Sequence, residues 1–128
     1  MKDEEKAIGE AVEAYLEAIK TGDRGHFEKA FYPDSVVINA GEDDPSQSVI
    51  PIADFSERVK ARHETGIYVE EVPLGITKSY IGRVGNVRLD FKLIIGDKSL
   101  YGTDYFNLVK RGGTWRISQK IYDVTHEA

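Results

Sequence analysis

The 128-residue chain contains no cysteine, which excludes disulfides, thiolate metal sites and a cysteine nucleophile. Long hydrophobic runs are also missing, because apolar stretches such as Leu93-Ile94-Ile95 are far shorter than the ~20 residues that span a bilayer. Positive charge is scarce: 17 lysines and arginines stand against 22 acidic residues, a net charge of −5. No basic cluster is longer than Lys110-Arg111, so we expect neither a nucleic-acid partner nor a membrane partner.

The residues that are present fit one globular domain. A length of 128 residues lies within the roughly 100–150 residues typical of a domain, and 41% of the residues are hydrophobic. No linker, repeat or low-complexity tract divides the sequence, so we expect a single domain over residues 1–128. The charged start, Met1 to Lys6, lacks the apolar run of a signal peptide. We therefore expect a cytoplasmic protein, and the lack of cysteine fits a reducing compartment.

Helical periodicity dominates the first half of the sequence. Apolar residues recur at steps of three and four from Ile8 to Ile19, with charged residues between them, which predicts an amphipathic helix. Gly22 is a suitable stop, since glycine adopts the left-handed conformation without a side-chain penalty. Asp23 can cap a short second helix that ends before Pro33. The spacing predicts a third helix from about Ile52 to His63.

The second half has the signature of strands joined by tight turns. Gly96-Asp97 and Gly112-Gly113 are hairpin signals, whereas Gly41 to Ser48 has the composition of a loop. Helices followed by hairpin-connected strands predict an α+β fold, with the N-terminal helices packed on one face of a curved antiparallel sheet. The predicted strands are Ser35 to Ala40, Leu74 to Ile81, Val87 to Leu93, Leu100 to Lys110 and Thr114 to Thr125.

Two polar residues fall on apolar strand faces. Alternation places Asp104 on the same face as Phe106 and Leu108, and places Gln119 on the same face as Trp115. These faces assume that neither strand has a β-bulge, because a bulge transfers every later residue to the other face. An ionised carboxylate is costly to bury without a partner. Asp104 therefore indicates a polar-studded pocket, whereas Gln119 fits the pocket and the solvent equally well.

Tyr15 and His63 fall on apolar stripes of the predicted helices. Tyr15 can point its hydroxyl into the same pocket, or it can be a core tyrosine with its hydroxyl at the edge. His63 can act as a base there, or it can simply interact with carbonyl groups at a helix end. The spacing alone leaves both alternatives open.

The other face of the strand from Leu100 to Lys110 carries Tyr101, Thr103 and Tyr105. Tyrosine is enriched in the cores of protein interfaces. We therefore expect a homodimer that pairs through this sheet face, with a plain solvated face as the alternative.

Metal and cofactor signatures are missing. His26, His63 and His126 lie in separate segments without the spacing of zinc ligands. No glycine-rich phosphate loop or nucleophile-elbow serine occurs either. We expect no metal and no cofactor.

Two motifs carry a family resemblance over nearly the whole chain. They are the early segment Tyr15 to Asp23 (YLEAIKTGD), followed by Phe31-Tyr32-Pro33-Asp34, and the late segment Asp104 to Lys110 (DYFNLVK), followed by Trp115 to Tyr122 (WRISQKIY). In these motifs the chain resembles the nuclear transport factor 2-like superfamily, and most of all its lumazine-binding branch. The resemblance implies a cone-like, cystatin-like roll in which a curved sheet wraps around the first helix. It also implies a pocket at the mouth of the cone and dimers through the sheet.

Bacterial ketosteroid isomerases of the same superfamily allow a comparison by residue. Tyr15 and Asp104 match their two oxyanion-hole donors, whereas Asn39 stands where their general-base aspartate would fall. An amide cannot abstract a proton, so the resemblance implies half of that site. It leaves Tyr15 and Asp104 to hold a carbonyl oxygen, with His63 as a possible base.

We therefore expect a pocket for a small, planar, moderately apolar ligand that carries a carbonyl group. Isomerase- or lyase-type chemistry is one expectation, and a noncatalytic dimeric binding or interaction module is the alternative. The residues expected to line the pocket are Asn39, Phe55, Val59, Phe106, Trp115 and Gln119.

Overall fold

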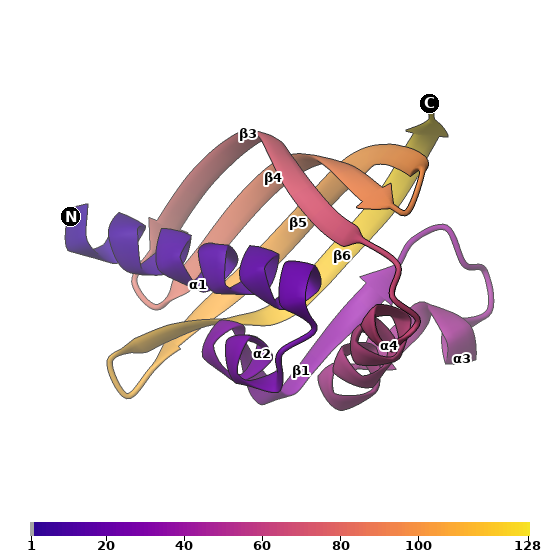
Figure 1. Cartoon of the computed structure of the whole chain (residues 1–128). Coiled ribbons are helices and arrows are strands. Elements are labelled where there is room, and N and C mark those ends of the chain that lie inside the picture. Colours follow the sequence, from indigo (N-terminus) through magenta and orange to yellow (C-terminus); the bar gives the residue numbers. More distant parts are fainter. Residues whose placement is uncertain (1) are drawn as a thin grey trace.

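A computed structural model describes residues 2–128 of the chain. Helices and strands appear in the order shown in Figure 1, with the helices in the first half and four long strands in the second. The helices are α1 Lys2–Thr21, α2 Arg24–Ala30, α3 Pro45–Ser48 and α4 Ile52–Glu64. The strands are β1 Phe31–Asn39, β2 Val49–Pro51, β3 Val69–Ile81, β4 Val84–Ile95, β5 Lys98–Arg111 and β6 Thr114–Glu127.

Helix α1 ends where its sequence predicts. Gly22 has a φ of +71°, and its N–H donates to the carbonyl of Ala18 at 2.8 Å, which closes the last turn. Asp23 then caps α2 by accepting from the N–H of Gly25 at 2.8 Å. The two helices therefore follow each other almost without a linker, and both turn their apolar sides towards the sheet.

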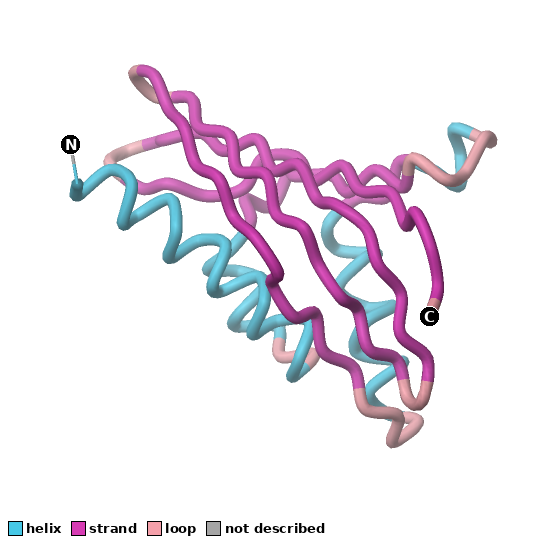
Figure 2. Tube along the Cα trace, turned by 90° about the horizontal axis from the view of Figure 1, so that it is seen from above, coloured by secondary structure: helices cyan, strands magenta, loops and turns pink. Residues whose placement is uncertain are grey.

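The six strands form one sheet in the order β2-β1-β6-β5-β4-β3. β3, β4, β5 and β6 are antiparallel neighbours, as the hairpin signals predict. β1, however, runs parallel to β6, so the sheet is mixed and not purely antiparallel as expected. The sheet curves, and α1, α2 and α4 pack in its concave face, whereas α3 projects from the end of β1 (Figures 1 and 2). The predicted α+β class is confirmed.

Three segments differ from the sequence prediction. Pro45–Ser48, expected as loop, forms the short helix α3, because Asp44 accepts from the N–H of Ser46 at 3.0 Å. β1 begins at Phe31 and tolerates Pro33 because its register against β6 shifts between Phe31 and Val36. β3 begins at Val69, five residues earlier than expected.

A bulge in β6 changes which of its residues face the helices. Asn107 pairs with Gln119 and Leu108 pairs with Ile117, so Ser118 is the extra residue. After Ser118, the residues that simple alternation assigns to the concave face of the sheet lie on its convex face, and the reverse. Lys120 is buried, whereas Gln119 lies on the convex face, where its side chain accepts from the amide of Asn107. The expectation that Gln119 faces the pocket is therefore wrong, because it assumed a strand without a bulge.

The core lies between α1 and the concave face of the sheet. Tyr15 of α1 is fully buried and meets the ring of Phe106 edge to face, at 5.1 Å between centroids. Asp104 is fully buried among these apolar side chains, on the same face of β5 as Phe106. Within residues 2–128, none of the helices combines the length and the apolar character that crossing a membrane requires.

Candidate functional site

Four polar side chains meet in the interior, each from a different element. Tyr15 comes from α1, Glu71 from β3, Asp104 from β5 and Lys120 from β6, and none is more than 4% exposed. The Tyr15 hydroxyl donates to Glu71 Oε1 at 2.5 Å. Lys120 Nζ lies 3.6 Å from Asp104 Oδ1, an ion pair whose two side chains are almost completely buried. We call these four residues the inner cluster.

The surroundings of Glu71 in the inner cluster favour its protonated form. Burial raises the pKa of Glu71 well above 4.5, and the charge of Asp104 and a hydrogen bond with it raise that pKa further, against the opposing effects of Lys120 and Tyr15. Burial and the same two carboxyls also raise the pKa of Tyr15 well above 10.0. These surroundings therefore favour the protonated form of Glu71, next to the ion pair of Lys120 with Asp104.

Hydrogen bonding supports this proton placement. Glu71 Oε2 and both carboxylate oxygens of Asp104 are buried, and no N–H or hydroxyl group of the described residues donates to them. Unsatisfied buried oxygens are costly, and a proton on Glu71 relieves part of that cost, because the protonated carboxyl can donate to Asp104.

Tyr15, Glu71 and Lys120 of the inner cluster form the polar wall of a cavity of about 190 Å³, the inner pocket. Lys120 Nζ lies beside three aromatic rings, 4.2 Å from the centroid of Tyr122, 4.9 Å from Tyr15 and 5.1 Å from Phe55. Arg58 and Arg62 of α4 also line the pocket. Its other lining residues are Ile19, Ile50, Val59, Val69, Glu71, Phe91, Leu93 and Val124.

Some of the residues predicted from the sequence lie together at this pocket. Tyr15, Phe55 and Val59 line it directly, and Asp104 lies behind the lining, paired with Lys120. Phe106 is fully buried against Tyr15 and supports the pocket without lining it.

The structure does not bring the other predicted residues to the pocket. His63 Nε2 lies 2.7 Å from the carbonyl oxygen of Ile19, so the ring contacts the end of α1, the structural alternative considered for it. Asn39 Oδ1 accepts from the N–H of Gly41 in the loop after β1. Trp115 Nε1 donates to Glu4 at 3.3 Å, near the start of α1. With Gln119 on the convex face, none of the four lines the inner pocket.

Sequence reasoning missed Glu71 and Lys120. Glu71 carries a signal, because alternation in the Val69-Glu70-Glu71-Val72 segment places it on the face of Val69, but this segment was not expected to be a strand. For Lys120, alternation gives no such signal, because this residue faces inward only as a result of the bulge at Ser118.

The arrangement provides an amine donor and a buried carboxyl of raised pKa beside a largely apolar cavity. Lys120 can donate to a ligand oxygen, and Glu71, held by Tyr15, can exchange a proton with a ligand atom next to it. Among residues 2–128, no three histidine, aspartate or glutamate side chains converge as the ligands of a metal ion do.

Comparison with known proteins identifies a matching family and several structures of the same fold. The sequence model of a family described as "Putative lumazine-binding" matches residues 3–123. No functionally curated protein matches the sequence. The chain is similar in structure to an NTF2-like protein of unknown function from Silicibacter pomeroyi (18% identity, 97% of this chain and 98% of that chain covered, TM-score 0.76).

Two further solved structures have the same fold. One is described as a putative scytalone dehydratase from Novosphingobium aromaticivorans (19% identity, 100% and 91% covered, TM-score 0.77), and the other is LinA (14% identity, 98% and 88% covered, TM-score 0.76). At these identities the likeness establishes the fold alone. Since the family model spans nearly the whole sequence, the chain belongs to the putative lumazine-binding family, and it has the fold of the NTF2-like structure from Silicibacter pomeroyi.

Proposed function

We propose that the inner pocket binds a compact, planar, moderately apolar molecule through a carbonyl oxygen. The observation that supports this most is Lys120, a buried ammonium group that lines an otherwise largely apolar cavity. Its N–H groups suit an acceptor oxygen, while the rings of Tyr122 and Phe55 offer flat apolar surface. A cavity of about 190 Å³ is smaller than the ~300–1,000 Å³ of sites for drug-sized ligands, which favours ligands of one or two rings.

A second proposal is that the pocket catalyses proton transfer next to that carbonyl, an isomerase-type reaction. The specific observation in its favour is Glu71, a buried carboxyl at the pocket whose pKa is raised by burial and by the nearby Asp104. In its ionised form Glu71 can take a proton from the carbon beside the carbonyl. Lys120 stabilises the resulting enolate oxygen, and Glu71 returns the proton to the conjugated carbon. Tyr15 holds Glu71 in place through its hydroxyl group.

The binding proposal is tested with 2-cyclohexenone, a planar enone of one ring. We expect saturable binding in calorimetry and a rise in melting temperature, because ligand at 100 times its Kd adds about 2.7 kcal/mol of stability. Lys120→Met should abolish binding, whereas Arg62→Gln, which also lines the pocket but lies outside the inner cluster, should retain it. Binding that is unchanged in Lys120→Met would refute the assignment.

The catalytic proposal is tested with 3-cyclohexenone, whose conversion to 2-cyclohexenone is followed by ultraviolet absorbance. Glu71→Gln keeps an acceptor for Tyr15 and a donor for Asp104 but cannot take a proton. We expect this variant to bind 2-cyclohexenone like the wild type and to lose turnover. Binding by the wild type without any turnover would identify a noncatalytic binder, the alternative function of this pocket.

We also propose that the protein is a homodimer through the convex face of the sheet. Tyr105 on β5 is 44% exposed there, with the Arg88 guanidinium 5.9 Å from its ring centroid. Side-chain amides of Asn86, Asn107 and Gln119 hydrogen-bond in a row across β4, β5 and β6, which gives this face an ordered polar surface. Tyr105→Arg should yield a monomer in sedimentation velocity experiments. A wild-type protein that sediments as a monomer at micromolar concentration would contradict the proposal.

A further inference from the structure

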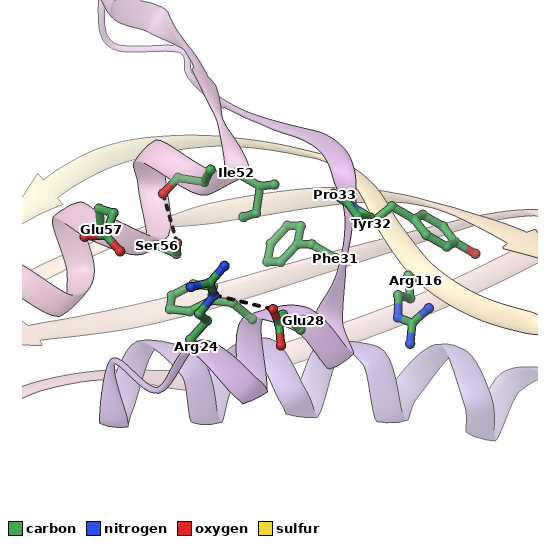
Figure 3. Close-up of a pocket in the computed structure, with 11 residues that line it drawn as sticks. Arg24, Glu28, Phe31, Tyr32, Pro33, Ile52, Ser56, Glu57 and Arg116 are labelled. Atoms are coloured by element: carbon green, nitrogen blue, oxygen red, sulfur yellow. Dashed lines mark hydrogen bonds and ion pairs between the residues drawn. The ribbon is translucent and has the colours of Figure 1, made fainter.

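A second cavity of about 480 Å³ lies between α2, β1 and α4, and it shares no lining residue with the inner pocket. We call it the outer groove. Figure 3 shows Phe31 in the middle of it, Arg24 and Glu28 on α2, and Ser56 and Glu57 on α4. Its apolar surface comes from Phe27, Phe31, Tyr32, Pro33, Ile52 and Ala53. This volume lies within the range of sites for small organic ligands.

One layer of aromatic rings separates the two cavities. Phe27 of the outer groove meets Phe55 of the inner pocket at 6.2 Å between ring centroids. Phe31 of the outer groove meets Tyr15 of the inner pocket at 6.0 Å. Because both contacts are edge to face and all four rings are at least partly buried, the layer is a packed wall and the outer groove is a separate site.

Arg116, a half-buried arginine whose Nε has no acceptor, lines the outer groove beside β1. Arg116 Nε is inaccessible to solvent and donates to no acceptor of the described residues. Among those residues, no carboxylate lies within ion-pair distance of Arg116, whereas Arg24 on α2 is paired with Glu28 and the neighbouring Arg111 is paired with Asp34. The Arg116 guanidinium is also held 5.7 Å from the ring centroid of Tyr32, so it is positioned as well as unpaired.

The charges around the groove select the ligand. Arg116 supplies one unpaired positive charge, and a planar guanidinium suits a carboxylate. Glu28 and Glu57 line the groove with negative charge, which disfavours a dianion such as a phosphate ester. The aromatic surface of Phe27 and Phe31 suits a flat apolar body. We propose that the outer groove is a binding site for an aromatic monocarboxylate, with Arg116 as the anchor of its carboxylate.

The test compares 2-naphthoate with its neutral analogue 2-naphthamide by calorimetry. We expect the wild type to bind the acid at least about tenfold more tightly than the amide, since a charge-assisted pair with Arg116 is available to the acid alone. Arg116→Gln should lower the affinity for the acid to that for the amide. Ala53→Trp, which places a bulky ring in the groove, should abolish binding of both compounds.

Arg62→Gln is the matched control, because Arg62 lines the inner pocket and not the outer groove. Loss of 2-naphthoate binding in Arg62→Gln but not in Arg116→Gln would place the acid in the inner pocket and overturn the inference. Equal affinities of the wild type for acid and amide would overturn it as well. The acid–amide comparison needs no variant, and the melting temperature of each variant verifies its folding. The inference does not depend on the proposed function of the inner pocket.

Discussion

Replacing Glu71 by glutamine should change how the stability of this protein depends on pH. Glutamine mimics the protonated carboxyl, because its carbonyl oxygen can accept from Tyr15 and its amide can donate to Asp104. It differs in having no proton to lose. The substitution therefore preserves the contacts of the inner cluster and removes the titration of one buried group.

The raised pKa of Glu71 determines whether the stability of the protein rises or falls with pH. Above about pH 4.5 the unfolded chain loses the proton of this carboxyl, while the folded chain keeps it until the pH reaches its raised pKa. The group's stabilisation is fully present below pH 4.5 and is lost as the pH rises towards the folded-state pKa. The loss is at most about 1.4 kcal/mol per pH unit.

Urea unfolding at pH 5 and pH 7 measures the effect. We expect the free energy of unfolding of Glu71→Gln, relative to the wild type, to improve by about 1–3 kcal/mol between these two values. Glu10→Gln, on the exposed face of α1, controls for the loss of one negative charge. A Glu71→Gln difference that moves no more with pH than that of Glu10→Gln would show that Glu71 is ionised in the folded protein and would refute the raised pKa of this carboxyl.

Two further substitutions test the packing around the inner cluster. Lys120→Met should lower the free energy of unfolding by about 3–5 kcal/mol, because it leaves Asp104 buried without its cation, and adding Asp104→Asn should restore part of that loss in urea unfolding. Gly102→Ala should cost about 1–3 kcal/mol, since its methyl group would lie 2.1 Å from the carbonyl oxygen of Asp123. Gly75→Ala, whose methyl group would have its nearest neighbour at 3.6 Å, is the control, and equal melting temperatures of the two alanine variants would contradict the steric argument.

The fold was largely predictable because its signals are local. The three-and-four spacing of apolar residues in α1, the glycine at position 22 and the hairpin signal Gly96-Asp97 each act within a few residues. The parallel pairing of β1 with β6 was not predictable in this way. It joins Phe31 to Ile117, and no short-range pattern reports which distant strand will be the neighbour.

Two of the four residues of the inner cluster were predictable from the sequence, and the strand registers explain why Lys120 was not. Tyr15 and Asp104 lie in regular segments, where periodicity identifies the buried face correctly. Lys120 lies just beyond the bulge at Ser118, so simple alternation assigns it to the wrong face and assigns Gln119 to the pocket. A lysine in a strand also suggests solvent exposure, and this one is buried because it pairs with Asp104 and lies against aromatic rings of the pocket.

The position of β6 within the sheet has a consequence for how the chain folds. β6 is the last strand in sequence order, yet it lies between β1 and β5 and joins the β1–β2 pair to the strands β3, β4 and β5. On a ribosome, β1 therefore has no partner in the main sheet until residues beyond Thr114 have been synthesised. The buried lysine arrives with the same strand, so until then the carboxylate of Asp104 has no cation to pair with. Closing so long a loop is entropically costly and slow. Sheet completion and charge neutralisation of the interior should thus coincide as one late, cooperative step.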